Sequence, residues 1–413
     1  MSVENPEGPP ARRFLNANSP PAPATLVAIT GVAAMSMNIF LPSLPHMAEE
    51  FGTSYNVMQL SVALYLALTA VTQIILGPLA DRYGRRPILL ASYAVFAIAS
   101  LGCILSENVV TFLGFRMLQA AVYSGVVLAR TMVRDTMPED EAASTIGYLT
   151  MGMAMVPMVS PTLGGFLDAT FGWRASFWLM FGLGSAAIWL IWRDVGETRV
   201  RGYSSFAEQF RDYPQLLKSK TFWSYSLAMA FSAGTYFAYL GGAPFVGVQV
   251  FRLDSVTLGV LFGASSLGYA TGSFLSGRLS RRIGVRRMVF AGCLVTTCAI
   301  TLSLALFIIH LGNQWTFFGF MVLVGVGYGM TLPNAMSGML SGSAHLAGTA
   351  SGLGGAIMIG GGAALSALTG AVMVPGAGAE RMLIIQLFCA CASVGAAVFV
   401  LRSAKVTPPQ TSD

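Results

Sequence analysis

The chain has 413 residues, of which 54% are apolar and 10% are charged, whereas roughly 25% of the residues in soluble domains are charged. Such a chain has too few charges to cover the surface of a soluble enzyme. The formal net charge of +6 does not indicate a nucleic-acid-binding protein, because the basic residues lie in short segments between apolar blocks, where a membrane surface accounts for them.

The apolar residues come in blocks of about twenty, the length that a helix needs to cross roughly 30 Å of hydrocarbon. Lipid also forces a spanning backbone to satisfy its own hydrogen bonds, which favours helices. We therefore predict an all-α integral membrane protein with twelve transmembrane helices. In chain order, the spans are expected at residues 24–44, 56–79, 87–106, 109–133, 143–167, 174–193, 221–242, 256–277, 287–309, 315–337, 346–372 and 381–402. Residues 1–22 and 403–413, rich in Pro and polar residues, are expected to be cytoplasmic tails.

The distribution of Lys and Arg predicts how the chain is oriented. With the N-terminus inside the cell, almost all basic residues fall in inner loops or at inner span ends. Only Arg174, Arg252 and Arg381 fall on the outer side, and Arg116 lies within a span. Because cytoplasmic loops of membrane proteins are enriched in Lys and Arg, both termini are predicted to be cytoplasmic.

The spans form two groups of six. A basic cytoplasmic loop at 194–220 separates a bundle at 23–193 from a bundle at 221–402. The segments after the second and the eighth span match at four positions, which are Gly77 with Gly277, Arg82 with Arg282, Gly84 with Gly284 and Arg86 with Arg286. A duplicated six-helix unit is typical of alternating-access carriers, whose substrate site lies between the two halves near the midplane of the membrane.

The segment 77–87, G-x-x-x-D-R-x-G-R-R-P, resembles the signature loop of the major facilitator superfamily. Its glycine permits close helix approach, and Asp81 can meet the positive N-terminal end of a neighbouring helix. The arginines lie at the inner surface, where they can pair across an inner gate; the alternative is that they only set the topology. The second copy has Arg281 in place of Asp81, which weakens such a lock there. The gate residues predicted from this segment are Gly77, Asp81, Arg82, Gly84, Arg85 and Arg86.

Three further stretches resemble narrower groups of that superfamily. Residues 115–120 are similar to its R-x-x-Q-G motif, with Ala120 in place of Gly. Residues 157–165 are similar to the antiporter motif G-P-x-x-G-G, with Ser160 in place of its first Gly. Residues 38–45 resemble the D-x-Y-L-P-x-L-P segment of the bicyclomycin and chloramphenicol/florfenicol resistance (Bcr/CflA) branch of the drug:proton antiporters.

The resemblance implies a bacterial inner-membrane transporter that exports small amphipathic compounds by drug:proton antiport. It also implies a working monomer in the lipid bilayer, with a proton gradient and no cofactor. Within the antiporter motif, the fifth span is expected to be kinked and to present a thin face to the eighth span, sealing the cavity; simple helix packing is the alternative. The residues concerned are Pro157, Pro161, Gly164 and Gly165.

Arg116 lies about seven residues into the fourth span, roughly 10 Å below the outer surface, and Asn38 lies at a similar depth in the first span. Gln119 follows Arg116 by three residues, or about one helical turn. An arginine at this depth normally faces a polar cavity or a partner, although it can also snorkel to the outer interface. We expect Arg116, Gln119 and Asn38 to form a central polar site.

In the resembling antiporters, an acid at the position of Asn38 is expected to carry the proton, and an amide does not titrate near neutral pH. No other carboxylate lies in the middle of a predicted span. Three explanations remain open. Protons couple through a peripheral acid such as Glu107 or Asp168; or the chain carries or exchanges an anionic or zwitterionic metabolite recognised by Arg116; or it is a coupling-dead Asp-to-Asn variant of an antiporter.

A polyspecific drug site needs apolar and aromatic walls with few fixed polar groups. Besides Asn38, Arg116 and Gln119, the candidate lining residues are Met35, Tyr65, Gln73, Tyr123, Met151, Met155, Tyr236, Tyr239, Phe262, Tyr328 and Asn334. For each aromatic residue, the alternative prediction is that its side chain faces lipid or packs in the core. The sequence has no P-loop and no cluster of His, Cys and acids with metal-ligand spacing, so we predict a transporter of small molecules and not an enzyme.

Overall fold

The structure, a computed structural model, describes residues 14–17, 19, 21–137, 139–198, 213–341 and 347–402. Every regular element within these ranges is a helix. The helices are α1 (Pro23–Asn38), η1 (Leu41–Ser43), α2 (Leu44–Glu50), α3 (Tyr55–Tyr83), α4 (Arg85–Ile104), α5 (Val109–Leu118), η2 (Gln119–Tyr123), α6 (Ser124–Thr136), α7 (Glu139–Phe171), α8 (Arg174–Asp194), α10 (Tyr213–Leu217), α11 (Lys220–Phe245), η3 (Val246–Val250), α12 (Ser255–Ile283), α13 (Val285–Ile308), α14 (Gln314–Ser341), α15 (Ala347–Val372) and α16 (Glu380–Arg402).

These helices make up twelve long units. Within the described ranges, ten units are long and apolar enough to cross a membrane, and the other two are α7 and α11, with 33 and 26 residues. The predicted all-α membrane fold with twelve spans is confirmed.

The first and the fourth span are broken helices. After α1, the first span continues through η1 and α2 to Glu50 and is therefore longer than predicted. Pro42 and Pro45 lie in the first turns of η1 and α2. Because proline has no backbone N–H, neither residue can donate the hydrogen bond that would continue the preceding helix. The fourth span changes from α5 to the 3₁₀ turn η2 directly after Leu118, and such a turn within a helix often marks a functional hinge.

The internal repeat is visible in the helix boundaries. The helices α3 and α12 both have 29 residues and begin 200 positions apart in the chain. Each ends at a glycine, Gly84 with φ +99° and Gly284 with φ +90°, and α4 and α13 begin directly afterwards. Residues other than glycine rarely adopt such φ values, so the same backbone turn requires the same residue in both halves.

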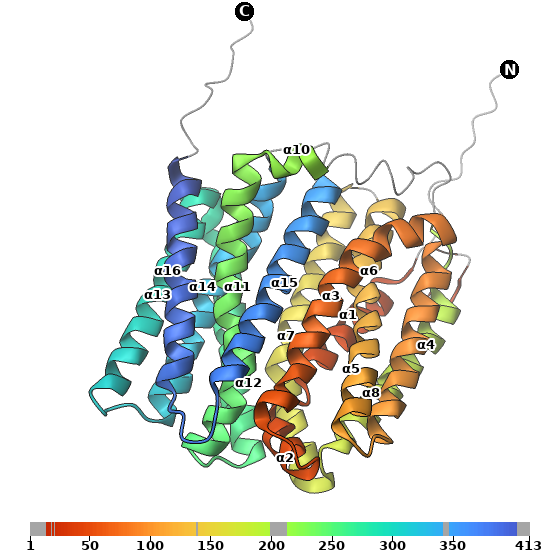
Figure 1. The fold of residues 1–413 in the computed structure, drawn as a ribbon. Helices are drawn as coiled ribbons and strands as arrows, with labels where there is room; N and C mark the ends of the chain where they lie inside the picture. The colour runs from red at the N-terminus through yellow and green to blue at the C-terminus, as the bar shows by residue number, and fades with distance from the viewer. Residues whose placement is uncertain are drawn as a thin grey trace, which may run out of the picture.

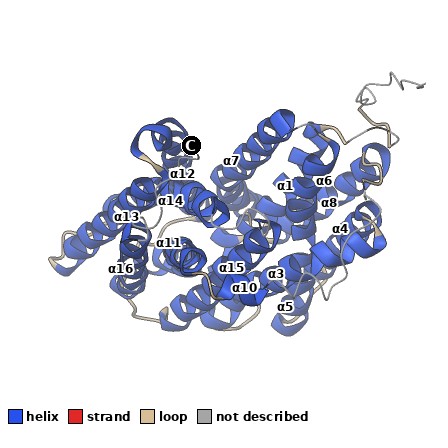
Figure 2. Ribbon diagram, turned by 90° about the horizontal axis from the view of Figure 1, so that it is seen from above, coloured by secondary structure: helices blue, strands red, loops and turns tan. Residues whose placement is uncertain are grey.

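The two six-helix halves lie side by side, α1 to α8 in red to yellow and α11 to α16 in green to blue (Figure 1). The view along the helices shows the same division (Figure 2). Most contacts between the halves are made by two helix pairs, α3 with α15 and α7 with α12. We call these pairs the α3–α15 seam and the α7–α12 seam.

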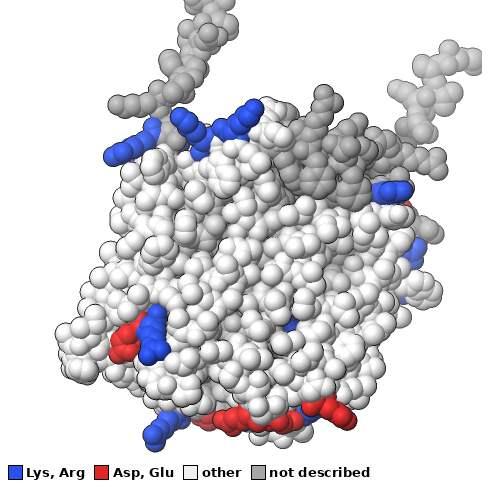
Figure 3. All heavy atoms as spheres, viewed as in Figure 1, with Lys and Arg blue, Asp and Glu red and all other residues white. Residues whose placement is uncertain are grey.

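The C-terminal end of α16 lies at one face of the molecule, which we call the terminal face, and α2 lies at the opposite face, the α2 face (Figure 1). Lys and Arg side chains gather at the terminal face, and Asp and Glu side chains gather at the α2 face (Figure 3). The belt between the two faces carries few charges in this view, as expected of a surface in contact with lipid.

Candidate substrate site and gates

Arg116 is completely buried in the first half. Its guanidinium donates hydrogen bonds to the carbonyl oxygen of Ser36 (2.9 Å) and to Oε1 of Gln119 (2.7 Å). It also lies over the rings of Tyr65 (4.0 Å) and Phe40 (4.4 Å), an arrangement stabilised by cation–π attraction. The alternative that Arg116 snorkels to the interface is therefore wrong.

The charge of Arg116 is met by neutral groups. Gln119, which accepts from the guanidinium, donates in turn to Oγ of Ser100 on α4 at 2.8 Å. Within the described part of the chain, the guanidinium contacts a serine, a glutamine and two aromatic rings, and none of these groups is a carboxylate. A buried cation held only by dipoles is costly in a membrane protein and points to function.

Asn38 faces away from Arg116 and toward the second half. Its Nδ2 donates to the carbonyl oxygen of Ala34 (3.0 Å), and its Oδ1 accepts from the hydroxyl of Tyr236 on α11 (3.4 Å). The expected common site for Asn38 and Arg116 is thus divided between two sides of α1. Residues two positions apart on a helix point about 200° apart, so Ser36 turns to Arg116 while Asn38 turns to Tyr236.

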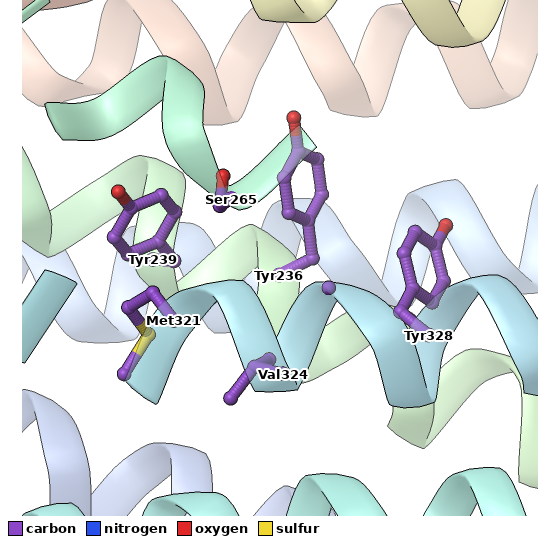
Figure 4. Close-up of a pocket in the computed structure, with 7 residues that line it drawn as sticks. Tyr236, Tyr239, Ser265, Met321, Val324 and Tyr328 are labelled. Atoms are coloured by element: carbon purple, nitrogen blue, oxygen red, sulfur yellow. The ribbon is translucent and has the colours of Figure 1, made fainter. Parts of the chain in front are cut away.

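A cluster of aromatic rings lies opposite Asn38 in the second half. Tyr236 stacks on Tyr328 with ring centroids 5.7 Å apart, and Tyr239 stacks on Phe262 at 4.6 Å. The hydroxyl groups of Tyr236, Tyr239 and Tyr328 all point to the same side (Figure 4). The pocket between these rings is lined by Tyr236, Tyr239, Ser265, Met321, Val324, Gly325 and Tyr328 and holds about 10 Å³, room for one water molecule.

The remaining predicted lining residues are distributed over several environments. Asn334 donates to Oγ of Ser276 (2.6 Å) and ties α14 to α12 inside the second half. Gln73 lies against Gly355 in the α3–α15 seam, and its Oε1 is buried without a hydrogen-bond partner. Met35 and Tyr123 are partly buried, Met155 is exposed, and the side chain of Met151 lies outside the described residues.

Small residues close the α7–α12 seam near the α2 face. A Cβ atom added at Gly165 would clash with the carbonyl of Ser255, and one added at Gly259 would clash with the carbonyl of Pro161. The thin face predicted for the fifth span does contact the eighth span. Gly164 is an exception, because it lies against the carbonyl of Ile39, where the first span is broken.

Polar side chains close the α3–α15 seam near the same face. Nε2 of Gln59 donates to Oγ of Ser366 on α15 at 2.8 Å. Beside this seam, the hydroxyl of Tyr55 donates to the carbonyl of Gly241 on α11 at 3.0 Å. A Cβ atom added at Gly370 would lie 2.6 Å from Oε1 of Gln59. Together with the α7–α12 seam, these contacts hold the two halves together at the α2 face.

A buried carboxylate also joins the halves there. Asp168 of α7 accepts a hydrogen bond from Oγ of Ser255, the first residue of α12, at 2.7 Å, and its other oxygen lies 2.9 Å from Nδ1 of His46. The sequence identified Asp168 only as one of two peripheral acids. The other, Glu107, is exposed in the α4–α5 connection.

On the terminal face, the described arginines of segment 77–87 form contacts inside the first half. Arg85 forms an ion pair with Asp135 of α6. Nη2 of Arg86 donates to the carbonyl of Trp192 (2.7 Å). These contacts lie within one half, and the pairing of the arginines across an inner gate stays a prediction. Arg82 is exposed and lies over the ring of Tyr83.

The acid at the N-terminal end of α4 is Glu197, which the sequence did not single out. Its carboxylate accepts from the backbone N–H groups of Arg85 (3.0 Å) and Arg86 (3.3 Å), a position where a helix favours negative charge. The side chain of Asp81, which was expected at such a position, and the surroundings of Gly77 lie outside the described residues.

Sequence reasoning missed several residues that hold the site together, namely Ser36, Phe40, Gln59, Ser100 and Ser366. The available signal was weak for the serines, which are common in membrane helices and often bond to their own backbone. It was stronger for Gln59, because a glutamine within an apolar span requires a polar partner.

Comparisons with known proteins agree with this architecture. Residues 26–367 match the sequence profile of the Major Facilitator Superfamily. The chain is 33% identical over 332 residues to the "Chloramphenicol resistance protein" of Pseudomonas aeruginosa. This match covers 77% of this chain and 76% of that protein. It is 26% identical over 362 residues to "Multidrug resistance protein D" of Escherichia coli (strain K12), with coverages of 87% and 90%.

A solved structure shares the fold. The crystal structure of a D-xylose-proton symporter matches with a TM-score of 0.73 and 15% identity, over 94% of this chain and 98% of that one. The match to the family over most of the chain also agrees with the resemblance of segment 77–87. This chain therefore belongs to the Major Facilitator Superfamily and is a multi-pass membrane transporter of small molecules, not an enzyme.

Proposed function

We propose that this protein exports small amphipathic compounds, including amphenicol-like antibiotics, across the bacterial inner membrane by alternating access and proton antiport. The proposal is supported by relatives named for chloramphenicol and multidrug resistance. The observation that carries it is the hydrogen bond from Tyr236 to Asn38, because it joins the two halves where an aromatic cluster faces a polar side chain.

The terminal face is cytoplasmic in this proposal, since Lys and Arg gather there (Figure 3) and cytoplasmic loops are enriched in these residues. The α2 face is then the outer one. The α3–α15 and α7–α12 seams near that face form the outer gate, which is closed in this conformation. A monomer is sufficient for such a cycle, because both halves of the site belong to one chain.

The substrate binds between Asn38 and the aromatic cluster of Tyr236, Tyr239 and Tyr328. Aromatic walls with a few polar groups suit compounds that are apolar in one part and hydrogen-bonding in another. The space of about 10 Å³ between the rings is far too small for a drug, so the rings must part when the halves move. Stacked rings held by few polar contacts can separate without leaving a buried charge unpaired.

The alternative of a dedicated carrier for an anionic or zwitterionic metabolite depends on Arg116. The guanidinium is enclosed by Phe40, Tyr65, Ser36 and Gln119 and has no exposed surface. A substrate anion would have to displace these groups to reach it. The enclosure favours a fixed positive charge within the first half over a direct substrate contact.

Resistance profiling in a bacterial host that lacks its own drug pumps tests the proposal. Expression of the chain should raise the inhibitory concentrations of chloramphenicol and of a chemically unrelated amphipathic drug, and Tyr236→Ala should reduce both. In proteoliposomes, an imposed pH gradient should accelerate drug movement. Resistance to no drug, combined with tight binding of a single anionic ligand, would identify a dedicated metabolite carrier instead.

A further inference from the structure

Three side chains at the outer gate form a connected group that we call the Asp168 cluster: His46 on α2, Asp168 on α7 and Ser255 on α12. The carboxylate of Asp168 accepts from Ser255 through one oxygen and lies 2.9 Å from Nδ1 of His46 through the other. The Asp168 side chain is 2% exposed, whereas the His46 side chain is 50% exposed. The carboxylate is thus buried beneath a histidine that reaches solvent.

The cluster spans the boundary between the halves. His46 and Asp168 belong to the first half, and Ser255 is the first residue of α12, the second-half helix of the α7–α12 seam. At the same place, Gly165 contacts the backbone of Ser255. The hydrogen bond from Ser255 and the burial of Asp168 on that side therefore depend on a closed seam. When the halves separate at this face, water replaces Ser255 and reaches the carboxylate.

We propose that the Asp168 cluster is a proton-binding site of the outer gate, at which a proton taken up by His46 from the outside stabilises the closed gate. This inference rests on the proposed function, which places the α2 face outside the cell. Because an ionised carboxylate only accepts hydrogen bonds, the nitrogen of His46 that faces Asp168 must carry the hydrogen, and protonation of the ring then adds a positive charge beside the carboxylate.

The sign of the effect follows from the cost of burying charge. Closing the seam removes the Asp168 carboxylate from water, and an unpaired buried charge is far more costly than a paired one. A neutral imidazole offers the carboxylate only a hydrogen bond, whereas an imidazolium offers a charge-assisted one, which is roughly twice as strong. Outside protonation of His46 therefore favours the closed gate over the open one.

Other charged groups lie near the cluster and have partners of their own. Glu50, on the same helix as His46, interacts with it electrostatically and is paired with Arg174 of α8. Asp254 precedes α12 and is held by Thr257. Within this set, histidine is the residue type whose charge ordinarily changes between about pH 5 and pH 8. His46 is the histidine of the cluster.

The direction of this response suits an exporter driven by an inward proton gradient. After releasing its substrate outside, such a transporter must close its outer gate, and an acidic exterior would promote that step. Since His46 reaches solvent even when the gate is closed, its proton exchanges with the outside and does not cross the membrane. The cluster sets the equilibrium of the gate; it is not the carrier of the transported proton.

The experiment measures gate closure without any substrate. Native cysteines are replaced, Leu105→Cys and Trp315→Cys place one spin label on each half at exposed positions of the α2 face, and the full chain is reconstituted in lipid nanodiscs. Electron-spin distance measurements then give the ratio of closed to open molecules. This ratio should rise by up to about tenfold from about pH 8 to about pH 6, the change produced by a tenfold difference in proton affinity between two states.

Three variants separate the roles of the cluster. His46→Gln should remove the pH response, and Asp168→Asn should remove it as well because no charge is then buried. Ser255→Ala should lower the closed fraction at every pH and keep the slope. Two matched controls should behave like the parent: His310→Gln, at an exposed histidine at the end of α13, and Thr170→Ala, at an exposed neighbour on α7 whose hydroxyl donates to carbonyls of its own helix.

A flat profile in the parent chain, or an unchanged slope in His46→Gln, would overturn the inference. The two measured distances of the closed and open states also report whether each variant is folded. Drug resistance is recorded separately for the same variants. If gate closure does not change with pH but the chain still exports drugs, only the proton-binding role of the Asp168 cluster is rejected. If gate closure changes with pH but the chain moves no drug, the proposed export is rejected and the role of the cluster is retained.

Discussion

Ser36 and Asn38 lie two residues apart on α1 and hold opposite sides of the site: the carbonyl of Ser36 accepts from Arg116 at 2.9 Å, and Asn38 accepts from Tyr236 at 3.4 Å. One short stretch of helix thus connects a buried charge in the first half to the boundary with the second half. The helix α1 ends at Asn38, and the short 3₁₀ helix η1 begins at Leu41. A rotation of this stretch would disturb both contacts together.

Asn38→Asp should make transport more strongly dependent on a pH gradient. The substitution is nearly isosteric and adds a group that can bind and release a proton beside Tyr236, where the halves meet. We would measure drug uptake into proteoliposomes with and without an imposed gradient, and use Asn38→Ala to separate loss of the Tyr236 contact from gain of charge. If a pH gradient drives the parent and Asn38→Asp equally, position 38 has no part in coupling.

Arg116→Met should reduce export by at least about tenfold, the effect of about 1.4 kcal/mol on a rate, while thermal stability changes little. Replacing a buried charged group by an apolar one of similar volume is often neutral for stability, because the cost of burying the charge disappears. Inhibitory drug concentrations and melting temperatures in detergent check the two parts. Arg381→Met is the control, since that arginine is exposed and donates a hydrogen bond to the backbone carbonyl of Val372. Full export by Arg116→Met would make the arginine a structural residue.

Gly165→Ala should hold the outer gate open. The added Cβ would meet the backbone of Ser255 in the closed seam, and overpacking of this kind costs about 1–3 kcal/mol. The closed-to-open ratio should fall by about tenfold or more, together with drug export. Gly182→Ala on α8 is a matched control, because its Cβ would enter open space. Normal closure in Gly165→Ala would show that the seam can widen without cost.

Gly84→Ala should destabilise the protein more than Gly284→Ala. Both glycines have φ near +90°, and a backbone held in a region that favours glycine costs other residues about 1–3 kcal/mol. At Gly84 the added Cβ would also lie 2.5 Å from Oε2 of Glu197, whereas nothing lies within 4 Å at Gly284. Melting temperatures of the two variants, compared with that of Gly182→Ala, check the difference. Equal losses would mean that Glu197 moves aside freely.

Much of the fold could be predicted because hydrocarbon imposes simple requirements on a sequence. Apolar blocks of about twenty residues gave the twelve spans, and the matched glycines Gly84 and Gly284 already marked the repeat. The main errors concern breaks within spans. The continuation of the first span to Glu50 and the 3₁₀ turn after Leu118 depend on local backbone geometry, which hydropathy does not report.

The sequence by itself determined that the chain crosses a membrane in two related six-helix halves, and that Arg116 lies deep within a span. Only the tertiary structure decided which groups meet there. Arg116 binds Ser36 and not Asn38, and Asp168 lies beneath His46 and against Ser255. The reason is physical: hydrophobicity fixes how deep a residue lies, but the rotation of each helix about its axis, set by packing against its neighbours, fixes the direction in which its side chain points.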